Sequence, residues 1–213
     1  MAIHKRKQQK RSSWKKGVEV GPRDPFTPSN VKRIRALLAK HGDAGLRDLA
    51  LFSTAIDTML HGSDLLSLTV KDVRQRNRIM RDTVKVTTAG KGGDVHCTLS
   101  KETRSVLESW IISSAKKPRD HLFTARTKGH SKPLTARQLT RLVKTWAAGI
   151  GLDPVAYGTG SLRRTRATHI LSKTGNLEAV RLLLGHSDIG STARYLGVVK
   201  QPDPLAISRA YEI

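Results

Sequence analysis

The chain has 213 residues, of which 38% are hydrophobic, so it is long enough to form one sizeable domain around a packed core. Lysine and arginine number 39 against 17 acidic residues, which gives a formal net charge of +22 at pH 7. A charge of this size favours a polyanion as the partner and argues against a merely soluble basic protein.

The cysteine content and the apolar runs restrict the compartment. The lone Cys97 excludes an internal disulfide and indicates reducing surroundings. No segment approaches the roughly 20 apolar residues of a membrane span, and the charged N-terminus lacks the apolar run of a secretory signal. We therefore expect a cytoplasmic protein that associates with nucleic acid and has no membrane partner.

The N-terminal segment, residues 1–24, differs from the rest of the chain. It carries eight lysines or arginines against two acids and shows no hydrophobic periodicity, which predicts a disordered basic arm. Such an arm can lie along phosphates. We expect Lys5, Arg6 and Lys7 to make contacts of this kind.

Two helices are predicted after the arm. Apolar residues recur at helical spacing over 27–42, where Ser29 or Asn30 is the expected cap and Gly42 the expected end. Residues 44–62 are apolar on all sides, which predicts a more buried helix.

The pattern then changes from helix to strand. Residues 62–73 indicate a short helical turn. Further along the chain, apolar residues occur at every second position, at Val84 and Val86 and again at Val95, Cys97 and Leu99. Glycine-rich residues 89–93 separate the two alternating runs. This predicts a β-hairpin with Lys91 at its tip.

The second half of the chain is predicted to consist mainly of helices, several of which end at a glycine. Residues 118–133 predict a loop, and residues 203–213 can form a last helix. The other helices are predicted at 100–114, 135–151, 161–175, 176–186 and 190–198. The whole pattern predicts a mainly α fold with a small antiparallel β-sheet, an α+β class.

Three arginines, Arg163, Arg164 and Arg166, cluster within four positions shortly after Gly160. Guanidinium groups pair with phosphate oxygens, and the start of a helix adds free backbone N–H groups and a favourable dipole. A solvated helix face is the plainer alternative. We interpret the cluster as a phosphate site and expect Arg164 and Arg166 to contact the backbone of DNA.

The residues after this cluster carry a family resemblance. Gly185 and His186 end the next predicted helix, Tyr195 follows His186 by nine positions, and Arg163 precedes His186 by 23. Together with "LHGSDLLSLTVKDV" and the hairpin "GKGGDVHCTL", this order and spacing resembles the tyrosine recombinase, or phage integrase, family from about Thr27 to Val198.

The resemblance implies the fold of that family's catalytic domain and a chemistry. Tyr195 would attack a DNA phosphate and form a 3′-phosphotyrosyl link, with Arg163 clamping the phosphate and His186 donating a hydrogen bond to it. Lys91 would protonate the departing 5′-oxygen. The covalent link would store the phosphodiester energy, so neither a metal nor another cofactor is expected.

Two positions depart from the family pattern. His61 stands where the family has an arginine, and Gly160 stands where it has a histidine. His61 can donate to a phosphate oxygen but cannot form the bidentate fork of an arginine. His169 lies about 240° round the helix from Arg163 and should face elsewhere, whereas Tyr157 in the preceding loop is freer to approach.

The residues at the predicted active site are compatible with two functions. The first is a site-specific recombinase or integrase that cuts and rejoins double-stranded DNA as a homo-oligomer, a dimer or tetramer. The alternative is a catalytically impaired DNA-binding protein on the same fold. A metal-dependent nuclease is disfavoured, because no cluster of Asp, Glu and His has ligand spacing.

We expect a catalytic domain at 25–199 and a tail at 200–213 that can pack on a neighbouring protomer.

Overall fold

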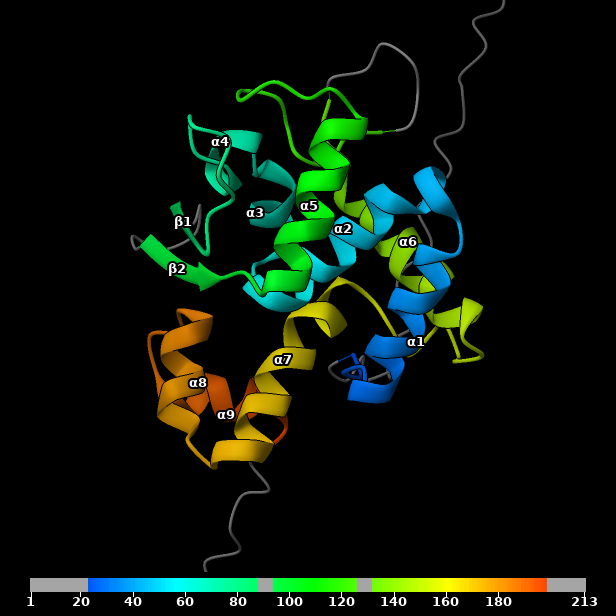
Figure 1. Ribbon diagram of the computed structural model, residues 1–213. Coiled ribbons are helices and arrows are strands. Elements are labelled where there is room, and N and C mark those ends of the chain that lie inside the picture. The colour runs from blue at the N-terminus through cyan, green and yellow to red at the C-terminus, as the bar shows by residue number, and fades with distance from the viewer. Residues whose placement is uncertain (1–22, 88–93, 126–131, 199–213) are drawn as a thin grey trace, which may run out of the picture.

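The computed structural model describes residues 23–87, 94–125 and 132–198. Within them the fold is mainly helical with one two-stranded antiparallel sheet, so the expected α+β class is confirmed (Figure 1). The arm residues Lys5, Arg6 and Lys7, the hairpin residue Lys91 and the tail 200–213 lie outside the described residues. The elements are α1 (Pro28–Ala39), α2 (Gly42–Thr58), α3 (Gly62–Ser67), α4 (Val70–Val73), β1 (Thr83–Thr87), β2 (Asp94–Thr98), α5 (Lys101–Ser113), α6 (Ala136–Gly149), α7 (Thr159–Thr174), α8 (Leu177–Leu184) and α9 (Ile189–Leu196).

Helix α2 forms the centre of the molecule, in agreement with its apolar sequence. It packs against α1, α5 and α7 (Figure 1). Phe52 of α2 is fully buried and meets Trp146 of α6 edge-on, with ring centroids 5.5 Å apart. The main core therefore joins the first helices of the domain to α6.

The start of α1 differs from the expectation. Thr27 is the cap, and its hydroxyl accepts a hydrogen bond from the backbone N–H of Asn30 at 3.2 Å. Pro28 occupies the first helical position, where its fixed φ is already helical, so the cap falls on the residue before it. The predicted caps Ser29 and Asn30 are wrong. Gly42 begins α2 and does not end α1.

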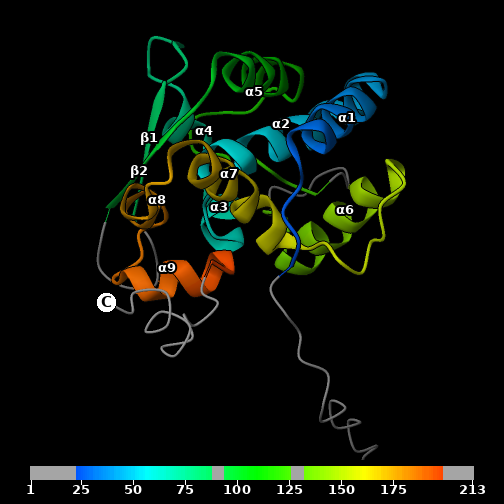
Figure 2. The same ribbon diagram turned by 90° about the horizontal axis from the view of Figure 1, so that it is seen from below.

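The predicted β-hairpin is present, and the structure gives its register. Val84 faces Cys97 and Val86 faces Val95 across the two strands, and Val84 and Cys97 are buried. The hairpin lies at one edge of the molecule beside α8 (Figures 1 and 2). Residues 88–93, which connect the two strands in sequence, are outside the described residues.

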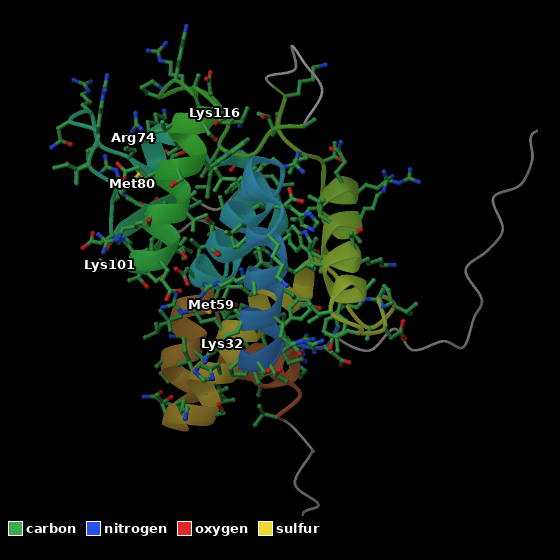
Figure 3. All side chains as sticks on the ribbon, turned by 45° about the vertical axis from the view of Figure 1, so that its right-hand side comes forward. Lys32, Met59, Arg74, Met80, Lys101 and Lys116 are labelled. Carbon is green, nitrogen blue, oxygen red and sulfur yellow. The ribbon has the colours of Figure 1, made fainter. Side chains whose placement is uncertain are left out.

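Helices α7, α8 and α9 form a layer at the C-terminal end of the described chain (Figure 2). They share a small second core with Met59, which follows α2 and is labelled in Figure 3. Gly175 and Gly185 end α7 and α8 in the left-handed conformation, as the sequence predicted. These stops set the short turns that bring α8 and α9 back against α7.

Candidate active site

Arg163 is the buried centre of the candidate site. It lies in the first half of α7, and only 6% of its surface is exposed. Its Nη2 donates to the carbonyl oxygen of Leu184 at 2.5 Å. That oxygen belongs to the last turn of α8, where carbonyl groups lack helical partners. The contact ties the arginine to the turn that carries His186. Among the described residues the buried Nε of Arg163 has no hydrogen-bond partner.

His186 follows the end of α8 and lies close to Tyr195. Its Nδ1 is 3.0 Å from the hydroxyl of the buried Thr192, a hydrogen bond that leaves Nε2 for a ligand. The ring meets that of Tyr195 edge-on, with centroids 5.4 Å apart and an interplanar angle of 88°. Burial lowers the pKa of His186, and the charge of Arg163 lowers it further.

Tyr195 sits near the end of α9 with its side chain turned toward α7. Its hydroxyl donates to the carbonyl oxygen of Gly160 at 3.5 Å. Burial raises the pKa of Tyr195, whereas the positive charges of Arg163 and Arg164 lower it. The phenol is therefore neutral at rest and lies beside the cation that would stabilise its anion.

His61 joins the same cluster. It is the residue before α3, has extended backbone, and makes no side-chain hydrogen bond to that helix. Burial lowers its pKa, Arg163 lowers it further, and Asp64 raises it. The charge of His61 in turn contributes to the lowered pKa of His186. The structure thus brings together His61, Arg163, His186 and Tyr195, which lie far apart in sequence.

Asp64 is a member of the cluster that the sequence reasoning did not single out. It is buried in α3, 7% exposed, and its charge raises the pKa values of both Arg163 and His61. The signal was its position three residues after His61 in "HGSD". A buried carboxylate of this kind offsets part of the cost of burying Arg163.

The structure gives Arg164 and Arg166 different surroundings from those expected. Arg164 is 7% exposed, and it donates to the carbonyl oxygens of Tyr195, at 3.0 Å, and of Arg23. Arg166 donates to the carbonyl oxygen of Asp57 and to the hydroxyl of Thr98. Both guanidinium groups are thus engaged within the protein. The first turns of α7 are buried, and no contact of either side chain among the described residues supports the expectation that Arg164 and Arg166 reach DNA, so that expectation stays a prediction.

Tyr157 and His169 are the two residues weighed as replacements for the histidine that is missing at Gly160. Tyr157 is buried, and its ring stacks on Phe26 with centroids 4.5 Å apart, so the expectation of a free side chain is wrong. His169 is exposed, as its helical position predicted. Gly160 lies in the first turn of α7, and a Cβ added to it would meet nothing within 4 Å.

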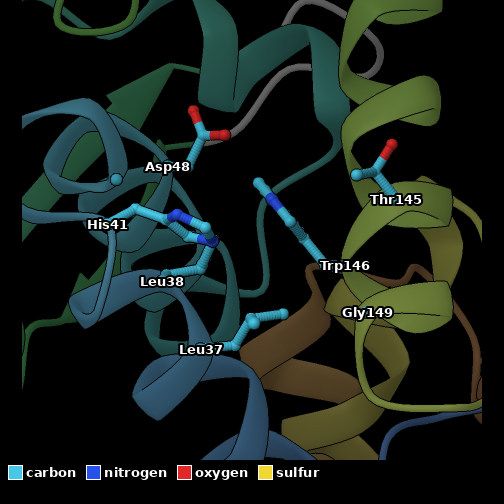
Figure 4. A pocket seen from close by; sticks show the side chains of 8 residues that line it. Leu37, Leu38, His41, Asp48, Thr145, Trp146 and Gly149 are labelled. Carbon is cyan, nitrogen blue, oxygen red and sulfur yellow. The ribbon is translucent and has the colours of Figure 1, made fainter.

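A separate pocket lies between α1, α2 and α6 (Figure 4). Its volume is about 330 Å³, and its lining includes Leu38, His41 and Trp146. It shares no lining residue with the tyrosine cluster, so it is not part of the candidate site.

In the part of the chain that the structure describes, no group of His, Cys, Asp and Glu could hold a metal ion, and no helix is long and apolar enough to cross a membrane.

The comparisons identify the class of protein to which this fold and site belong. The model of the phage integrase family matches residues 25–201, so the chain belongs to that family. The tyrosine recombinase XerD of Xanthomonas axonopodis pv. citri is 31% identical over 188 residues, 83% of this chain and 59% of that protein. XerC of Bacillus subtilis is 32% identical over 74% of this chain and 51% of its own length. The chain spans little more than half of these two curated relatives.

Solved structures agree in fold. The XerH site-specific recombinase bound to its palindromic difH substrate, in a post-cleavage complex, has a TM-score of 0.67 and 22% identity over 89% of this chain and 54% of that one. The catalytic domain of bacteriophage HP1 integrase has a TM-score of 0.53 and 19% identity over 89% of this chain and 95% of that one. The fold is therefore that of a tyrosine recombinase catalytic domain.

Proposed function

We propose that the protein is a site-specific DNA recombinase that cleaves and rejoins DNA through a 3′-phosphotyrosyl intermediate. The observation that carries this proposal is the placement of Tyr195 beside a buried arginine and a histidine, Arg163 and His186, in a chain of the phage integrase family. The two curated relatives, XerD and XerC, are named tyrosine recombinases, which supports the same reaction.

The chemistry follows from the charges of the cluster. A free tyrosine has a pKa of about 10, so roughly one phenol in a thousand is ionised at neutral pH. The phenolate oxygen of Tyr195 attacks the phosphorus, the bond to the 5′-oxygen breaks, and that oxygen takes up a proton. Negative charge grows on the non-bridging oxygens in the transition state, where Arg163 and His186 supply hydrogen bonds. A phosphate oxygen would also satisfy the unpaired Nε of Arg163.

Lys91 and His61 complete the proposed machinery. We assign the proton for the 5′-oxygen to Lys91, on the evidence of the family motif and of the hairpin whose strands lead toward it. His61 would donate to a phosphate oxygen in place of the family's arginine, because it lies in the electrostatic cluster of Arg163 and His186. The chemistry needs no metal ion, since the protein–DNA link keeps the phosphodiester energy.

The remaining assignments concern the whole molecule. We assign residues 1–24 to a DNA-contacting arm that includes Lys5, Arg6 and Lys7, residues 25–199 to the catalytic domain, and 200–213 to a tail that packs on a neighbouring protomer. The partner would be double-stranded DNA, bound by a dimer or tetramer in the cytoplasm. The charge of +22 supports a polyanionic partner. A protein that only binds DNA is the weaker candidate, because none of the relatives described above is named as one.

Covalent trapping tests the proposal. The protein is incubated in EDTA with nicked duplexes from its native flanking DNA, in which the cleaved fragment diffuses away. We expect a protein–DNA adduct on a denaturing gel, and we expect its complete loss in Tyr195→Phe, which retains the ring but has no nucleophile. Binding of the same duplexes is measured by gel shift, so that loss of reaction is separated from loss of binding.

Two results would contradict the recombinase. Cleavage that requires Mg²⁺ and leaves no protein on the DNA would indicate a nuclease. Binding without an adduct, when the double variant His61→Arg and Gly160→His does form one, would indicate a DNA-binding protein whose catalysis has lapsed.

A further inference from the structure

A short N-terminal segment crosses the beginning of α7 and the loop before it. This strap, residues 23–26, is held at both ends: the backbone N–H of Asp24 donates to the carbonyl oxygen of Ala156 at 3.1 Å, and that of Phe26 donates to the hydroxyl of Thr165 at 2.9 Å. The ring of Phe26 packs into the main core. The carbonyl groups of the strap therefore have fixed positions relative to α7.

Arg164 connects this strap to the tyrosine. One of its Nη atoms donates to the carbonyl oxygen of Arg23 in the strap, and its Nε donates to the carbonyl oxygen of Tyr195 at 3.0 Å. Its guanidinium carbon lies 4.6 Å from the centroid of the Tyr195 ring. A planar group held by two carbonyl oxygens on different segments has little freedom to rotate, so the face presented to the ring is fixed.

Two of these three contacts act on Tyr195. The hydrogen bond fixes the backbone at Tyr195, and the cation–π contact fixes its ring. Arg163, one position earlier, is tied to Leu184 at the end of α8. Adjacent arginines of α7 thus hold α8 and α9 separately.

We propose that Arg164 is a positioning residue, which holds the ring and backbone of Tyr195 in place within the same protomer and is itself oriented by the strap at 23–26. The proposal rests on the proposed function, because positioning matters to catalysis only if Tyr195 is the nucleophile. It does not require Arg164 to touch DNA. An arginine of this kind keeps the phenol aimed before DNA binds, which reduces the entropy lost on reaching the transition state.

A probe on Tyr195 tests the placement without any DNA. Tyr157→Phe and Tyr211→Phe leave Tyr195 as the single tyrosine of a parent protein, which is then labelled with 3-fluorotyrosine. Fluorine NMR reports the surroundings of the ring and the pH midpoint of phenol ionisation. In Arg164→Met we expect a changed fluorine shift and a midpoint about one pH unit higher, because a cation over the ring favours the phenolate. Arg164→Lys retains the charge, so we expect its ionisation midpoint to lie close to that of the parent.

Arg194→Met is the matched control. Arg194 is adjacent to Tyr195 on the same helix, but it is exposed and donates only a long bond, 3.4 Å, to Ser191. Its loss should leave the fluorine shift and the midpoint unchanged. Circular dichroism checks that each variant is folded. If Arg164→Met does not fold, Arg164→Lys decides, because it also loses the rigid fork and should move the fluorine resonance.

The rate of adduct formation on the nicked duplex supplies the second readout. We expect Arg164→Met to react at least tenfold more slowly than the parent at saturating DNA, with unchanged DNA binding. A fluorine shift and midpoint equal to the parent's would overturn the proposal. If the parent forms no adduct at all, the recombinase function fails, and the fluorine spectra still decide whether Arg164 holds Tyr195.

Discussion

Gly160 has room for a side chain, because a Cβ at this position meets no atom within 4 Å, and its own carbonyl oxygen accepts from the hydroxyl of Tyr195. Gly160→His should therefore fit without distortion and place an imidazole next to the nucleophile. We expect adduct formation on nicked DNA to rise about tenfold or more, because a positioned base or acid contributes at least that much.

Gly160→Ala is the control for this change. It fills the space and removes a helix-destabilising glycine but adds no group that can transfer a proton. A gain of equal size in Gly160→Ala would contradict the chemical explanation and would assign the effect to the stability of α7.

The lowered pKa values of His61 and His186 have a consequence for stability. Burial is the first cause at both sites, and the charge of Arg163 is the second. At a pH just below the ordinary value of about 6.5 the unfolded state binds more protons at these sites than the folded state does. The free energy of unfolding should therefore fall as the pH drops through 6.5.

Urea unfolding at pH 7.5, 6.5 and 5.5 measures this effect. The variant with both His61→Gln and His186→Gln should lose less stability over the same interval. Parallel curves for the two proteins would show that the two histidines do not cause the pH dependence.

At the scale of the element, the local sequence predicted most of what forms. The hairpin forms from the two alternating runs and buries Val84 and Cys97 on one face, because a period of two places every second side chain on the same face. The glycine stops of α7 and α8 are also confirmed. The cap of α1 was predicted wrongly. Pro28 favours the first helical position, which moves the cap to Thr27, and the spacing of the apolar residues carries no information about this local effect.

Strand β2 provides a test of the hairpin. Cys97 is 4% exposed, and burial raises the pKa of its thiol to about 11, while Arg163 and Arg166 act in the opposite direction. At pH 8 we expect the folded protein to react with a thiol-directed reagent at least about 10²-fold more slowly than the protein in denaturant, because the thiolate is the reacting species.

The control for this reaction is Ser109→Cys in a Cys97→Ser background, since Ser109 is exposed on α5. That thiol should react at nearly the same rate in both conditions. Rapid labelling of Cys97 in the folded protein would contradict the burial of this face of the hairpin.

At the scale of the whole molecule, the excess of positive charge dominates. Cationic side chains such as Lys32 on α1 and Lys101 on α5 are exposed on the described part of the domain (Figure 3). Each phosphate that the protein neutralises releases counterions, so the logarithm of the DNA association constant should fall linearly with the logarithm of the salt concentration.

Replacing Lys5, Arg6 and Lys7 together by glutamine should reduce the steepness of this dependence by about one for each phosphate that the arm no longer neutralises. Arg181→Gln is the control, because Arg181 already pairs with Glu178 at 2.6 Å. Fluorescence anisotropy over a salt series measures both slopes. An unchanged slope in the triple variant would remove the arm from the DNA interface.

By itself the sequence determined the order of the elements, the class of the fold and the spacing of Arg163, His186 and Tyr195, because periodicity, caps and motifs are local properties of the chain. Only the tertiary structure decided which groups surround the neighbouring Arg164. Its partners include the carbonyl oxygen of Arg23, 141 positions away, and the ring of Tyr195. Backbone carbonyl groups have no signature in a sequence, so the folding of α7, α9 and the strap against one another was needed to bring them to this guanidinium.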